Sequence, residues 1–490
     1  MSTKKVSNGY LIDEYCNLNN VEIVKDGENV YSCVLNQTEI LKNKNKFYIL
    51  QLLKSQNKYI IYTRYGRIGE VGKKGEKEKA SKESGILEFK KLFRSKTGNI
   101  WNNGTEYKKQ KNKYFVSKIN YSEELGDIKN EKETKLPESK LDKKIVELIK
   151  LLSDVDMLNT TLIHMDIDVN KMPLGKLSKE QLDYAKKILD DISENIEKTI
   201  TTDIQNKIIE LSSEYYTYIP YACGRNTPPI IDNTKQITKY QDMIEELKNI
   251  VITKKIIQEK IKNENPIDNI YKNLNTEITP LNNNQVEYEL ISKFFKKTHA
   301  PTHDFKLDLM EIYKINDVNK KEIFDKKAKE IGNVQLLIHG SRMSNWCSIL
   351  KNGLLLDPSK LGVVITGRMF GYGIYFANSF SKSAQYCGIN YSGNGTICLA
   401  LAEVALGNEL KKQGADYYIN KEKLQKKNCH SCWGQGKMSP SSYTNHNNVK
   451  IPTGVLENTN ISSSLRYDEK IIYDTDQFII KYLVIAKMYY

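Results

Sequence analysis

Hydrophobic positions follow one pattern through the first quarter of the chain. Between residues 21 and 118, short apolar runs alternate with turn-forming residues, which predicts β-strands. A helix is predicted over 82–93, because Phe89 and Phe93 would share one of its faces. The predicted strands are 31–35, 47–53 and 59–63. Residues 21–118 are therefore predicted to form a small β-rich domain with one helix, preceded by a polar, disordered tail over 1–20.

A charged stretch over 119–135 has no regular hydrophobic period, and we interpret it as a linker. After it, hydrophobic residues recur with the period of an α-helix. The apolar residues that first recur at helical spacing are Ile145, Leu148, Ile149 and Leu152. A capping box at 178–181 predicts the start of a further helix, and helical patterns also cover 204–211 and 243–251. Residues 136–262 are therefore predicted to form an all-α bundle.

Beyond this bundle the pattern becomes mixed and mostly β. Short apolar runs at 334–338, 396–404 and 478–485 are typical of buried strands. Residues 263–490 are thus predicted to form a third domain that combines helices and sheets. The fold class expected for the whole chain is multidomain α+β.

Charge is distributed unevenly over these parts. The chain of 490 residues has a formal net charge of +14, and residues 1–118 hold 24 basic and 12 acidic side chains, or +12. The remaining 372 residues hold 50 basic and 48 acidic side chains, or +2. A basic module beside a nearly neutral remainder is the pattern expected when one domain binds a polyanion.

Composition excludes several classes of protein. No apolar run approaches the roughly 20 residues of a membrane span, and the first residues lack the apolar segment of a signal peptide. Eight scattered cysteines favour free thiols in a reducing compartment. Cys429 and Cys432 have zinc-like spacing, but no second pair of ligands follows them, so we expect no metal site. A soluble, intracellular protein is predicted.

Small and polar residues follow the predicted strand at 334–338, as His339-Gly340-Ser341-Arg342. Further motifs are Gly371–Ala377, Ser381–Tyr386, Glu403–Asn408 and Glu469–Asp474. A strand end followed by glycine exposes backbone groups that can bond a planar amide, and tyrosines offer faces on which an aromatic ring can stack. These features together suit a nicotinamide ring.

In this order, the motifs resemble those of the poly(ADP-ribose) polymerases, a branch of the diphtheria-toxin-like ADP-ribosyltransferases with a His, Tyr and Glu signature. Residues 168–178 and 206–220 are similar to the helical regulatory domain of that family. The basic first domain resembles a WGR domain, in which Tyr65 takes the place of the name-giving tryptophan. The resemblance implies a WGR domain over 21–118, an autoinhibitory helical domain over 136–262 and a catalytic domain on antiparallel sheets over 263–490.

The resemblance also implies that NAD⁺ is the substrate and assigns residues to it. Gly340 and Ser383 would hold the nicotinamide amide, while Tyr375 and Tyr386 would sandwich the ring. His339 would bond the ribose on the adenosine side. The remaining positions carried over to the NAD⁺ site are Ser341 and Phe376.

Glu469 would complete the catalytic set with His339 and Tyr375. Departure of nicotinamide leaves an oxocarbenium-like sugar, whose positive charge a nearby carboxylate stabilises, as in glycoside cleavage. The same carboxylate would orient or deprotonate the acceptor hydroxyl. With all three signature residues present, an active transferase is favoured over a pseudoenzyme.

Some positions depart from the family pattern. An arginine near the adenosine is replaced by Leu355, and the Gly-rich segment contains Arg368 and Tyr372 where relatives commonly have Tyr and Lys. Glu469 and Met369 favour elongation into a polymer. Two alternatives stay open: a mono-ADP-ribosyltransferase that never elongates, and a DNA-end-binding scaffold with weak catalysis.

Damaged DNA is the partner that the resemblance implies, as nicks or ends with a 5′-phosphate. Tyr65, Arg67, Trp101 and Lys108 are the candidate DNA-binding residues, although the neighbouring lysines could also form an ordinary solvated face. Docking on DNA would loosen the helical domain, which otherwise blocks NAD⁺. Acceptors would be proteins, with the chain itself and histones as candidates, in the nucleus during DNA repair.

Overall fold

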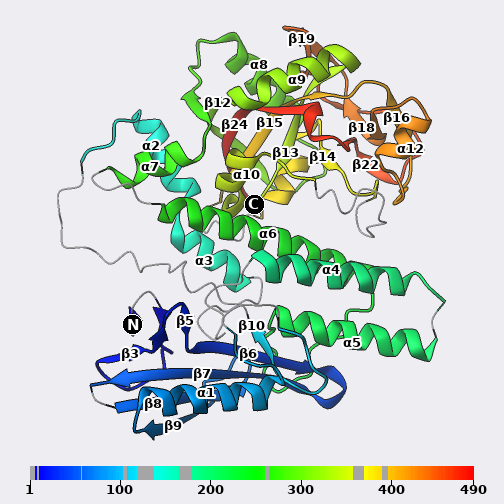
Figure 1. The fold of residues 1–490 in the computed structure, drawn as a ribbon. Coiled ribbons are helices and arrows are strands. Elements are labelled where there is room, and N and C mark those ends of the chain that lie inside the picture. The colour runs from blue at the N-terminus through cyan, green and yellow to red at the C-terminus, as the bar shows by residue number, and fades with distance from the viewer. Residues whose placement is uncertain are drawn as a thin grey trace. The chain divides into compact units, whose positions relative to one another are not determined.

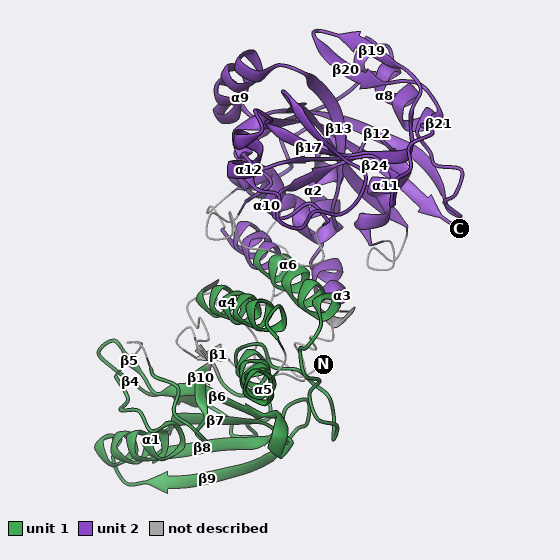
Figure 2. Cartoon of the chain, turned by 90° about the vertical axis from the view of Figure 1, so that its right-hand side faces the viewer, with its two compact units in different colours: residues 1–134, 162–248 green, residues 135–161, 249–490 purple. Residues whose placement is uncertain are grey.

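The computed structural model describes ten stretches of the chain. These are residues 6–7, 10–56, 58–102, 107–117, 137–164, 179–199, 201–259, 264–356, 369–388 and 395–490. They belong to two compact units, one formed by residues 1–134 with 162–248 and the other by 135–161 with 249–490 (Figure 2). Helix α6 (Thr234–Gln258) contributes residues to both units.

The first unit is built on a six-stranded antiparallel sheet with the order β10-β6-β7-β8-β9, in which β3 also pairs with β7. The strands are β3 (Val21–Ile23), β6 (Ser32–Glu39), β7 (Lys44–Ser55), β8 (Lys58–Arg67), β9 (Lys73–Lys79) and β10 (Phe115–Ser117). Two short hairpins accompany them, namely β1 (Val6–Ser7) with β2 (Tyr10–Leu11) and β4 (Lys25–Asp26) with β5 (Asn29–Val30).

Helix α1 (Lys82–Thr97) lies along β7 and β8 (Figure 1). It begins at a capping box between Ser81 and Ser84 and ends at Gly98, whose φ of 74° lies in the left-handed region that favours glycine. Its buried Phe89 and Phe93 join one hydrophobic cluster with residues of β6, β7 and β8. The apolar stripe read from the sequence is therefore the face that packs on the sheet.

Further helices among the described residues of the first unit are the end of α3 (Val155–His164), α4 (Lys179–Ile196), α5 (Thr202–Tyr218) and the first part of α6. Side chains of α5 complete hydrogen bonds at the end of β6. Thr217 Oγ1 accepts from the Thr38 N–H at 3.2 Å, and Ser213 Oγ accepts from the Ile40 N–H at 3.1 Å. Part of the helical region is thus bonded to the β-rich domain.

The second unit contains a seven-stranded sheet with the order β11-β12-β24-β15-β13-β20-β19. Its strands are β11 (Glu277–Pro280), β12 (Lys306–Asn316), β13 (Val334–Gly340), β15 (Thr396–Ala405), β19 (Tyr443–His446), β20 (Val449–Pro452) and β24 (Phe478–Tyr489). Neighbouring strands are antiparallel except for β13 and β20.

Two smaller sheets complete the β-structure of this unit. A four-stranded sheet has the order β14-β23-β17-β16 and a three-stranded sheet the order β21-β18-β22. The strands are β14 (Ile374–Phe376), β16 (Glu409–Lys412), β17 (Ser431–Gly434), β18 (Gly436–Pro440), β21 (Leu456–Asn458), β22 (Leu465–Tyr467) and β23 (Glu469–Ile472).

The helices of this unit are α2 (Lys143–Leu152), the first part of α3, α7 (Pro266–Asn273), α8 (Val286–Lys297), α9 (Val318–Ile331), α10 (Trp346–Asn352), α11 (Phe380–Ala384) and α12 (Lys421–Lys426), together with the last part of α6. The short 3₁₀ turns used below are η2 (Met343–Asn345) and η4 (Gln385–Cys387).

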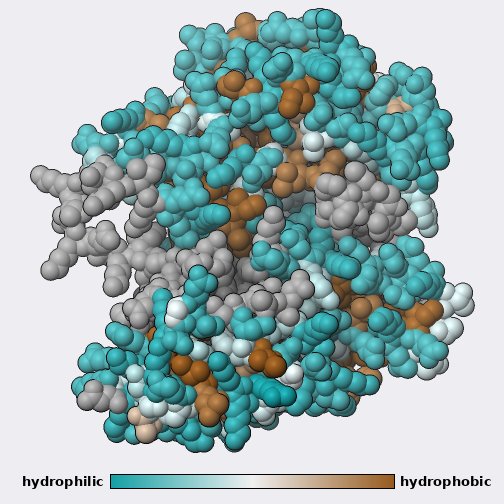
Figure 3. Space-filling model, in the orientation of Figure 1, coloured by the Kyte–Doolittle hydropathy of each residue, from teal (hydrophilic) through white to brown (hydrophobic). Residues whose placement is uncertain are grey.

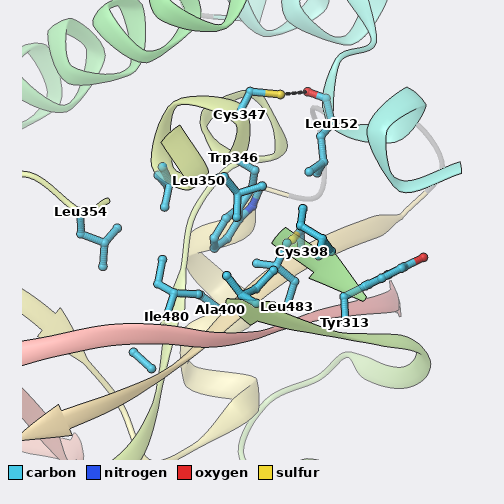
Figure 4. Packing of buried hydrophobic residues seen from close by; sticks show 14 of the residues in the cluster. Leu152, Tyr313, Trp346, Cys347, Leu350, Leu354, Cys398, Ala400, Ile480 and Leu483 are labelled. Atoms are coloured by element: carbon cyan, nitrogen blue, oxygen red, sulfur yellow. Dashed lines mark hydrogen bonds between the residues drawn. The ribbon is translucent and has the colours of Figure 1, made fainter. Parts of the chain in front are cut away.

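A large hydrophobic core joins α2 and α10 to the seven-stranded sheet. Leu152 of α2 and Trp346 of α10 lie in the same cluster as Ala400 and Leu483 of the sheet (Figure 4). The Cys347 thiol donates to the Leu152 carbonyl at 3.3 Å. Helix α2 is therefore part of the core on which the polar segment after β13 rests.

The predicted multidomain α+β class is confirmed, with a β-rich first part, helices in the middle and mixed structure at the end. Each predicted strand coincides with an observed one, and the described part of each predicted helix is helical. The predicted linker over 119–135 and the regulatory motif over 168–178 lie outside the described residues. The domain limits given above stay predictions.

The segment 10–20 differs from the disordered tail that was expected. Asp13 lies in the first unit with its carboxylate paired to Arg64, and both side chains are only 3% exposed. Arg64 Nε donates to Asp13 Oδ1 and Arg64 Nη2 to Asp13 Oδ2, both at 2.9 Å, while the Tyr62 hydroxyl also donates to Oδ1. A bidentate pair between residues 51 positions apart leaves no signal in local sequence patterns.

None of the described helices is long and apolar enough to cross a membrane. On the face drawn in Figure 3, hydrophilic residues cover most of the described surface, and hydrophobic residues form small separate patches. Scattered patches of this kind are normal on protein surfaces and need no partner to explain them.

Removing one partner of the buried pair should destabilise the first unit. In Asp13→Ala the Arg64 guanidinium would be left buried without its carboxylate, so we expect a loss of about 3–5 kcal/mol in the free energy of unfolding. Hydrogen exchange of β7 and β8 peptides in the full chain measures this. The control is Lys58→Ala, which breaks an exposed pair with Glu78 and should cost less than about 1 kcal/mol. Equal hydrogen exchange in both variants would show that the buried Asp13–Arg64 pair does not stabilise the first unit.

Candidate active site

The His, Tyr and Glu of the signature lie on three strands that meet where two sheets join. His339 is near the end of β13, Tyr375 is in β14 and Glu469 begins β23. Strands β14 and β23 pair directly, with Tyr375 opposite Ile471. A bridge between Ile338 and Ala377 connects β13 to the residue after β14. Residues separated by up to 130 positions are thereby brought onto neighbouring strands.

The orientation of His339 is fixed by a backbone carbonyl. Its Nδ1 lies 3.0 Å from the Tyr375 carbonyl oxygen. Since a carbonyl only accepts, Nδ1 carries the proton and Nε2 is the acceptor nitrogen of the neutral ring. An acceptor of this kind is what a ribose hydroxyl requires. The ring also packs edge-on against buried Phe376, with centroids 5.9 Å apart.

Tyr375 is held at its hydroxyl end. The hydroxyl donates to the Gly371 carbonyl at 2.8 Å and accepts from the Phe370 N–H at 3.1 Å. These bonds tie the ring to the Gly-rich segment and leave little rotational freedom. Tyr386 in η4, by contrast, is 61% exposed. One of the two tyrosines predicted to stack on nicotinamide is thus fixed in place and the other is solvent-accessible.

Gly340 and Ser383 lie in direct backbone contact. A Cβ atom added to Gly340 would lie 1.9 Å from the Ser383 carbonyl oxygen, so no larger residue fits at this position. The Ser383 side chain is buried, and its hydroxyl donates to the Ile338 carbonyl at 3.3 Å. Ser341 Oγ accepts from Asn345 Nδ2 at 3.0 Å. The end of β13 and helix α11 therefore form one rigid surface.

Lys382 is a site residue that sequence reasoning missed. Its ammonium donates to Glu469 Oε1, and the two side chains are only 13% and 14% exposed. Burial lowers the pKa of Lys382 from its ordinary value, an effect that the neighbouring Glu469 carboxylate opposes. The one available signal was a lysine placed between two small residues in the motif Ser381–Tyr386. Lys382 orients the carboxylate on which the predicted chemistry depends.

The departures from the family pattern fall in different places. Leu355 is 64% exposed, and Arg368 lies outside the described residues. Tyr372 is buried. Met369 is part-buried against a cluster around Phe370, and its carbonyl accepts from the Asp416 N–H at 2.7 Å.

The Cys429–Cys432 segment is engaged in the fold. Cys432 is buried in β17, where burial raises the pKa of its thiol to about 12. His430 Nδ1 accepts from the Asn408 N–H at 3.1 Å. In the part of the chain that the structure describes, no group of three or more His, Cys, Asp or Glu side chains could hold a metal ion.

The candidate DNA-binding residues differ in accessibility. Tyr65 is 42% exposed and stacks on Tyr48, with ring centroids 5.7 Å apart and planes 16° apart. Lys108 is also exposed. Trp101 instead packs edge-on against Phe89 and Phe93, each at 4.9 Å. Tyr65 and Lys108 therefore offer surface to a ligand, whereas most of Trp101 belongs to the domain core.

Arg67 has protein partners within the first unit. Its guanidinium donates to the Asn43 carbonyl at 3.1 Å and to the carbonyls of Gly224 and Asn226, which follow helix α5. Several lysines of this unit are also paired with carboxylates. They are Lys58 with Glu78, Lys77 and Lys79 with Glu88, and Lys82 with Asp26. Part of the positive charge counted in the sequence is thus neutralised locally.

Comparison with known proteins agrees with this geometry. Residues 285–488 match the family model of the poly(ADP-ribose) polymerase catalytic domain, 139–271 that of the regulatory domain and 31–111 that of the WGR domain. The chain is 34% identical to poly [ADP-ribose] polymerase 2 of Homo sapiens, over 94% of this chain and 80% of that protein.

The chain belongs to the poly(ADP-ribose) polymerase family. It is 32% identical to poly [ADP-ribose] polymerase 2 of Arabidopsis thaliana, over 96% of this chain and 75% of that protein. It is 35% identical to a poly [ADP-ribose] polymerase of Drosophila melanogaster over 98% of this chain, but spans only 48% of that protein. The chain therefore spans about half the length of several curated relatives.

The contact between Gly340 and Ser383 generates a prediction about ligand binding. Gly340→Ala should abolish binding of benzamide, a nicotinamide analogue, because the added methyl group would push the end of β13 away from α11. Isothermal titration of the purified chain measures the affinity. Gly414→Ala is the control, since its Cβ would approach only Ser464 Oγ, at 3.8 Å, and binding should be unchanged. Wild-type affinity in Gly340→Ala would show that this contact does not shape the site.

Proposed function

We propose that this chain is an ADP-ribosyltransferase that cleaves NAD⁺, is activated by broken DNA and transfers ADP-ribose to proteins, including itself. The observation that carries the proposal is the placement of His339, Tyr375 and Glu469 on adjoining strands, with Lys382 bonded to Glu469. The family assignment supports NAD⁺ as the substrate.

NAD⁺ would lie along the end of β13. The nicotinamide amide would bond the Gly340 backbone and the Ser383 hydroxyl, and the nicotinamide ring would stack between Tyr375 and Tyr386. His339 Nε2 would accept from a hydroxyl of the adenosine-side ribose. Ser341 and Phe376 complete the site, Ser341 beside the ribose and Phe376 as the support of the His339 ring.

The reaction breaks one bond and forms another. The N-glycosidic bond breaks and its electron pair leaves with neutral nicotinamide, so positive charge develops on the ribose. The Glu469 carboxylate stabilises that charge and accepts a hydrogen bond from the ribose 2′-hydroxyl. The acceptor oxygen then forms a bond to the anomeric carbon and releases its proton to Glu469.

Elongation into poly(ADP-ribose) is the proposed outcome, because the family resemblance associates Glu469 and Met369 with elongation. A chain that transfers a single ADP-ribose is the alternative. Electrophoretic mobility of the labelled product separates the two, since a polymer migrates as a heterogeneous smear and a single unit as a discrete band.

Regulation by DNA is supported by how the helical region is bonded. In the second unit, Thr253 Oγ1 of α6 donates to the Ser344 carbonyl at 3.3 Å. Ser344 lies in η2, four residues after the end of β13. Leu152 of α2 packs in the core beside Trp346. In the first unit, α5 is bonded to β6 of the WGR domain. The helical region thus touches both the proposed sensor and the proposed catalytic domain, and a local order–disorder transition within it could couple them.

The proposed partners follow from this reading. Nicks or ends with a 5′-phosphate would dock on the exposed Tyr65 and Lys108. Trp101 would support this surface from the domain core, and Arg67 would contact DNA only by exchanging carbonyl partners for a phosphate. Histones are candidate acceptors. The site of action would be the nucleus, in DNA repair.

NAD⁺ consumption by the purified chain tests the proposal. We expect turnover to rise when nicked DNA is added and to fall by at least about 10²-fold in Glu469→Gln, which removes the carboxylate charge and the base. Tyr65→Ala should lose the stimulation by DNA but keep the basal rate. Leu87→Ala, an exposed change on α1, is the control and should behave as wild type.

The outcomes separate the alternatives. No turnover by the wild-type chain under either condition favours the DNA-binding scaffold and refutes the proposed activity. Equal rates with and without DNA refute activation by DNA alone.

The buried Lys382 predicts a pH dependence. Because burial lowers its pKa, the ammonium loses its proton at a lower pH than an exposed lysine does, and the bond to Glu469 is then lost. The turnover rate should therefore fall as pH rises through the pKa of Lys382. In Lys382→Arg, whose guanidinium stays charged, this fall should move to higher pH, whereas Lys297→Arg on the exposed side of α8 should leave it in place. An unchanged alkaline limb in Lys382→Arg would exclude Lys382 as its origin.

A further inference from the structure

Three consecutive charged residues, Asp468, Glu469 and Lys470, lie at the start of β23. Asp468 is only 1% exposed and Lys470 only 2%. Charged side chains are almost never buried to this degree unless they are paired, because removing them from water is costly. Each of the three has its own set of partners, and the outer two have no role in the chemistry described above.

Asp468 receives three hydrogen bonds through its carboxylate. Oδ1 accepts from the Gly436 N–H at 2.7 Å, and Oδ2 accepts from Ser439 Oγ at 2.6 Å and from Asn378 Nδ2 at 2.9 Å. Gly436 and Ser439 belong to β18, whereas Asn378 follows β14. One buried carboxylate therefore ties the start of β23 to two other segments of the chain.

The contact with β18 is also close in the backbone. A Cβ atom added to Gly436 would lie 2.3 Å from the carbonyl carbon of Tyr467 and 2.5 Å from the Asp468 nitrogen. The segment before Glu469 is thus clamped between backbone contact on one side and side-chain hydrogen bonds on the other. A shift at Asp468 would move the adjoining Glu469 with it.

Lys470 anchors the other side of Glu469. Its ammonium donates to Glu409 Oε1 at 2.7 Å and lies 3.5 Å from the centroid of the Trp433 ring. Glu409 is in β16 and Trp433 in β17, so this anchor fixes β23 within its own sheet. Lys470 holds β23 to strands of its own four-stranded sheet, whereas the Asp468 carboxylate bonds to β18 of the three-stranded sheet and to Asn378.

Lys382 connects the anchor to the catalytic carboxylate. Its Nζ donates to the Asp468 carbonyl at 3.5 Å and also to the Glu469 carboxylate. The backbone at Asp468 therefore helps to set where Lys382 meets Glu469. None of the hydrogen bonds of Asp468 involves Gly340, Ser383 or Tyr375, the residues assigned to the nicotinamide end of NAD⁺.

We propose that Asp468 is a positioning residue that fixes the Glu469 carboxylate for transfer without contributing to nicotinamide binding. This inference rests on the proposed ADP-ribosyltransferase function. It requires that loss of the Asp468 hydrogen bonds lowers kcat, because a displacement of about 1 Å at a catalytic group can cost on the order of 10²-fold in rate. It also requires that KM for NAD⁺ and affinity for benzamide change little.

Asparagine should replace Asp468 with little loss. Its side-chain oxygen can accept from the Gly436 N–H, and its amide can donate to Ser439 Oγ. Asn378 Oδ1 is buried without a hydrogen-bond partner among the described residues, and a flip of the Asn378 amide would let it accept from the new amide. Geometry, rather than the negative charge, is therefore what the position requires.

The test compares Asp468→Ala, Asp468→Asn and Ser439→Ala in the full chain. Steady-state NAD⁺ turnover gives kcat and KM, and titration with benzamide reports the nicotinamide end of the site. We expect kcat to fall by about 10²-fold in Asp468→Ala, less in Ser439→Ala and only a few-fold in Asp468→Asn, with benzamide affinity unchanged in all three. Asp325→Ala, an exposed change on α9, is the matched control and should retain wild-type kinetics.

The outcomes distinguish this inference from the function on which it rests. Wild-type kcat in Asp468→Ala overturns the inference while leaving the proposed function intact. A parallel loss of kcat and benzamide affinity in Ser439→Ala also overturns it, since the role would then be general folding; this milder variant keeps the test decisive if Asp468→Ala does not fold. A wild-type chain without NAD⁺ turnover overturns the proposed function and the inference together.

Discussion

Two backbone hydrogen bonds between Ile338 and Ala377 determine the arrangement of the strands that hold the candidate active site. Ile338 N–H donates to the Ala377 carbonyl at 2.8 Å, and Ala377 N–H donates to the Ile338 carbonyl at 2.9 Å. They join the seven-stranded sheet to the four-stranded sheet. Each bond contributes only about 1 kcal/mol, but together they fix the register of β14 against β13. Because side chains alternate between faces of a strand, a slip of one residue would exchange the sides on which Tyr375 and Phe376 lie, and Phe376 would lose its contact with the His339 ring.

Buried charge then defines positions within this frame. The Lys382–Glu469 and Lys470–Glu409 pairs are both largely removed from solvent. Buried pairs of this kind contribute little net stability, because desolvation offsets much of the attraction, yet a charge left without its partner is strongly destabilising. Their consequence here is geometric: β23 has few alternative positions in which all of its charges remain paired. Accurate placement of one carboxylate thus depends on several ion pairs around it.

Sequence patterns were sufficient for the elements and for the family of the site, but not for its supports. Strand β13 and helix α1 follow from apolar runs and helical spacing, since both features are local. The partners of Glu469 and Arg64 are 87 and 51 positions away, and only the folded chain brings them together. Arg67 shows that a sequence pattern can also indicate a ligand contact where the folded chain supplies the partners. The resemblance to a WGR domain and the basic context indicate a DNA contact, whereas the structure gives the Arg67 guanidinium carbonyl partners within the chain.

The balance of charge around Glu469 differs from that of the basic first part of the chain. The carboxylates of Asp468, Glu469 and Glu409 are balanced by the ammonium groups of Lys382, Lys470 and Lys411, the last of which lies 5.4 Å from the centroid of the same Trp433 ring as Lys470. A surrounding without net positive charge leaves the Glu469 carboxylate free to attract a sugar on which positive charge develops, and this attraction is strong where water is excluded. It would also favour release of a polyanionic product, which a basic site would retain. The lysines around the Glu469 carboxylate, which is proposed to be catalytic, are thus already neutralised by protein carboxylates. The positive charge of the chain lies mainly in the WGR domain, where DNA is proposed to bind.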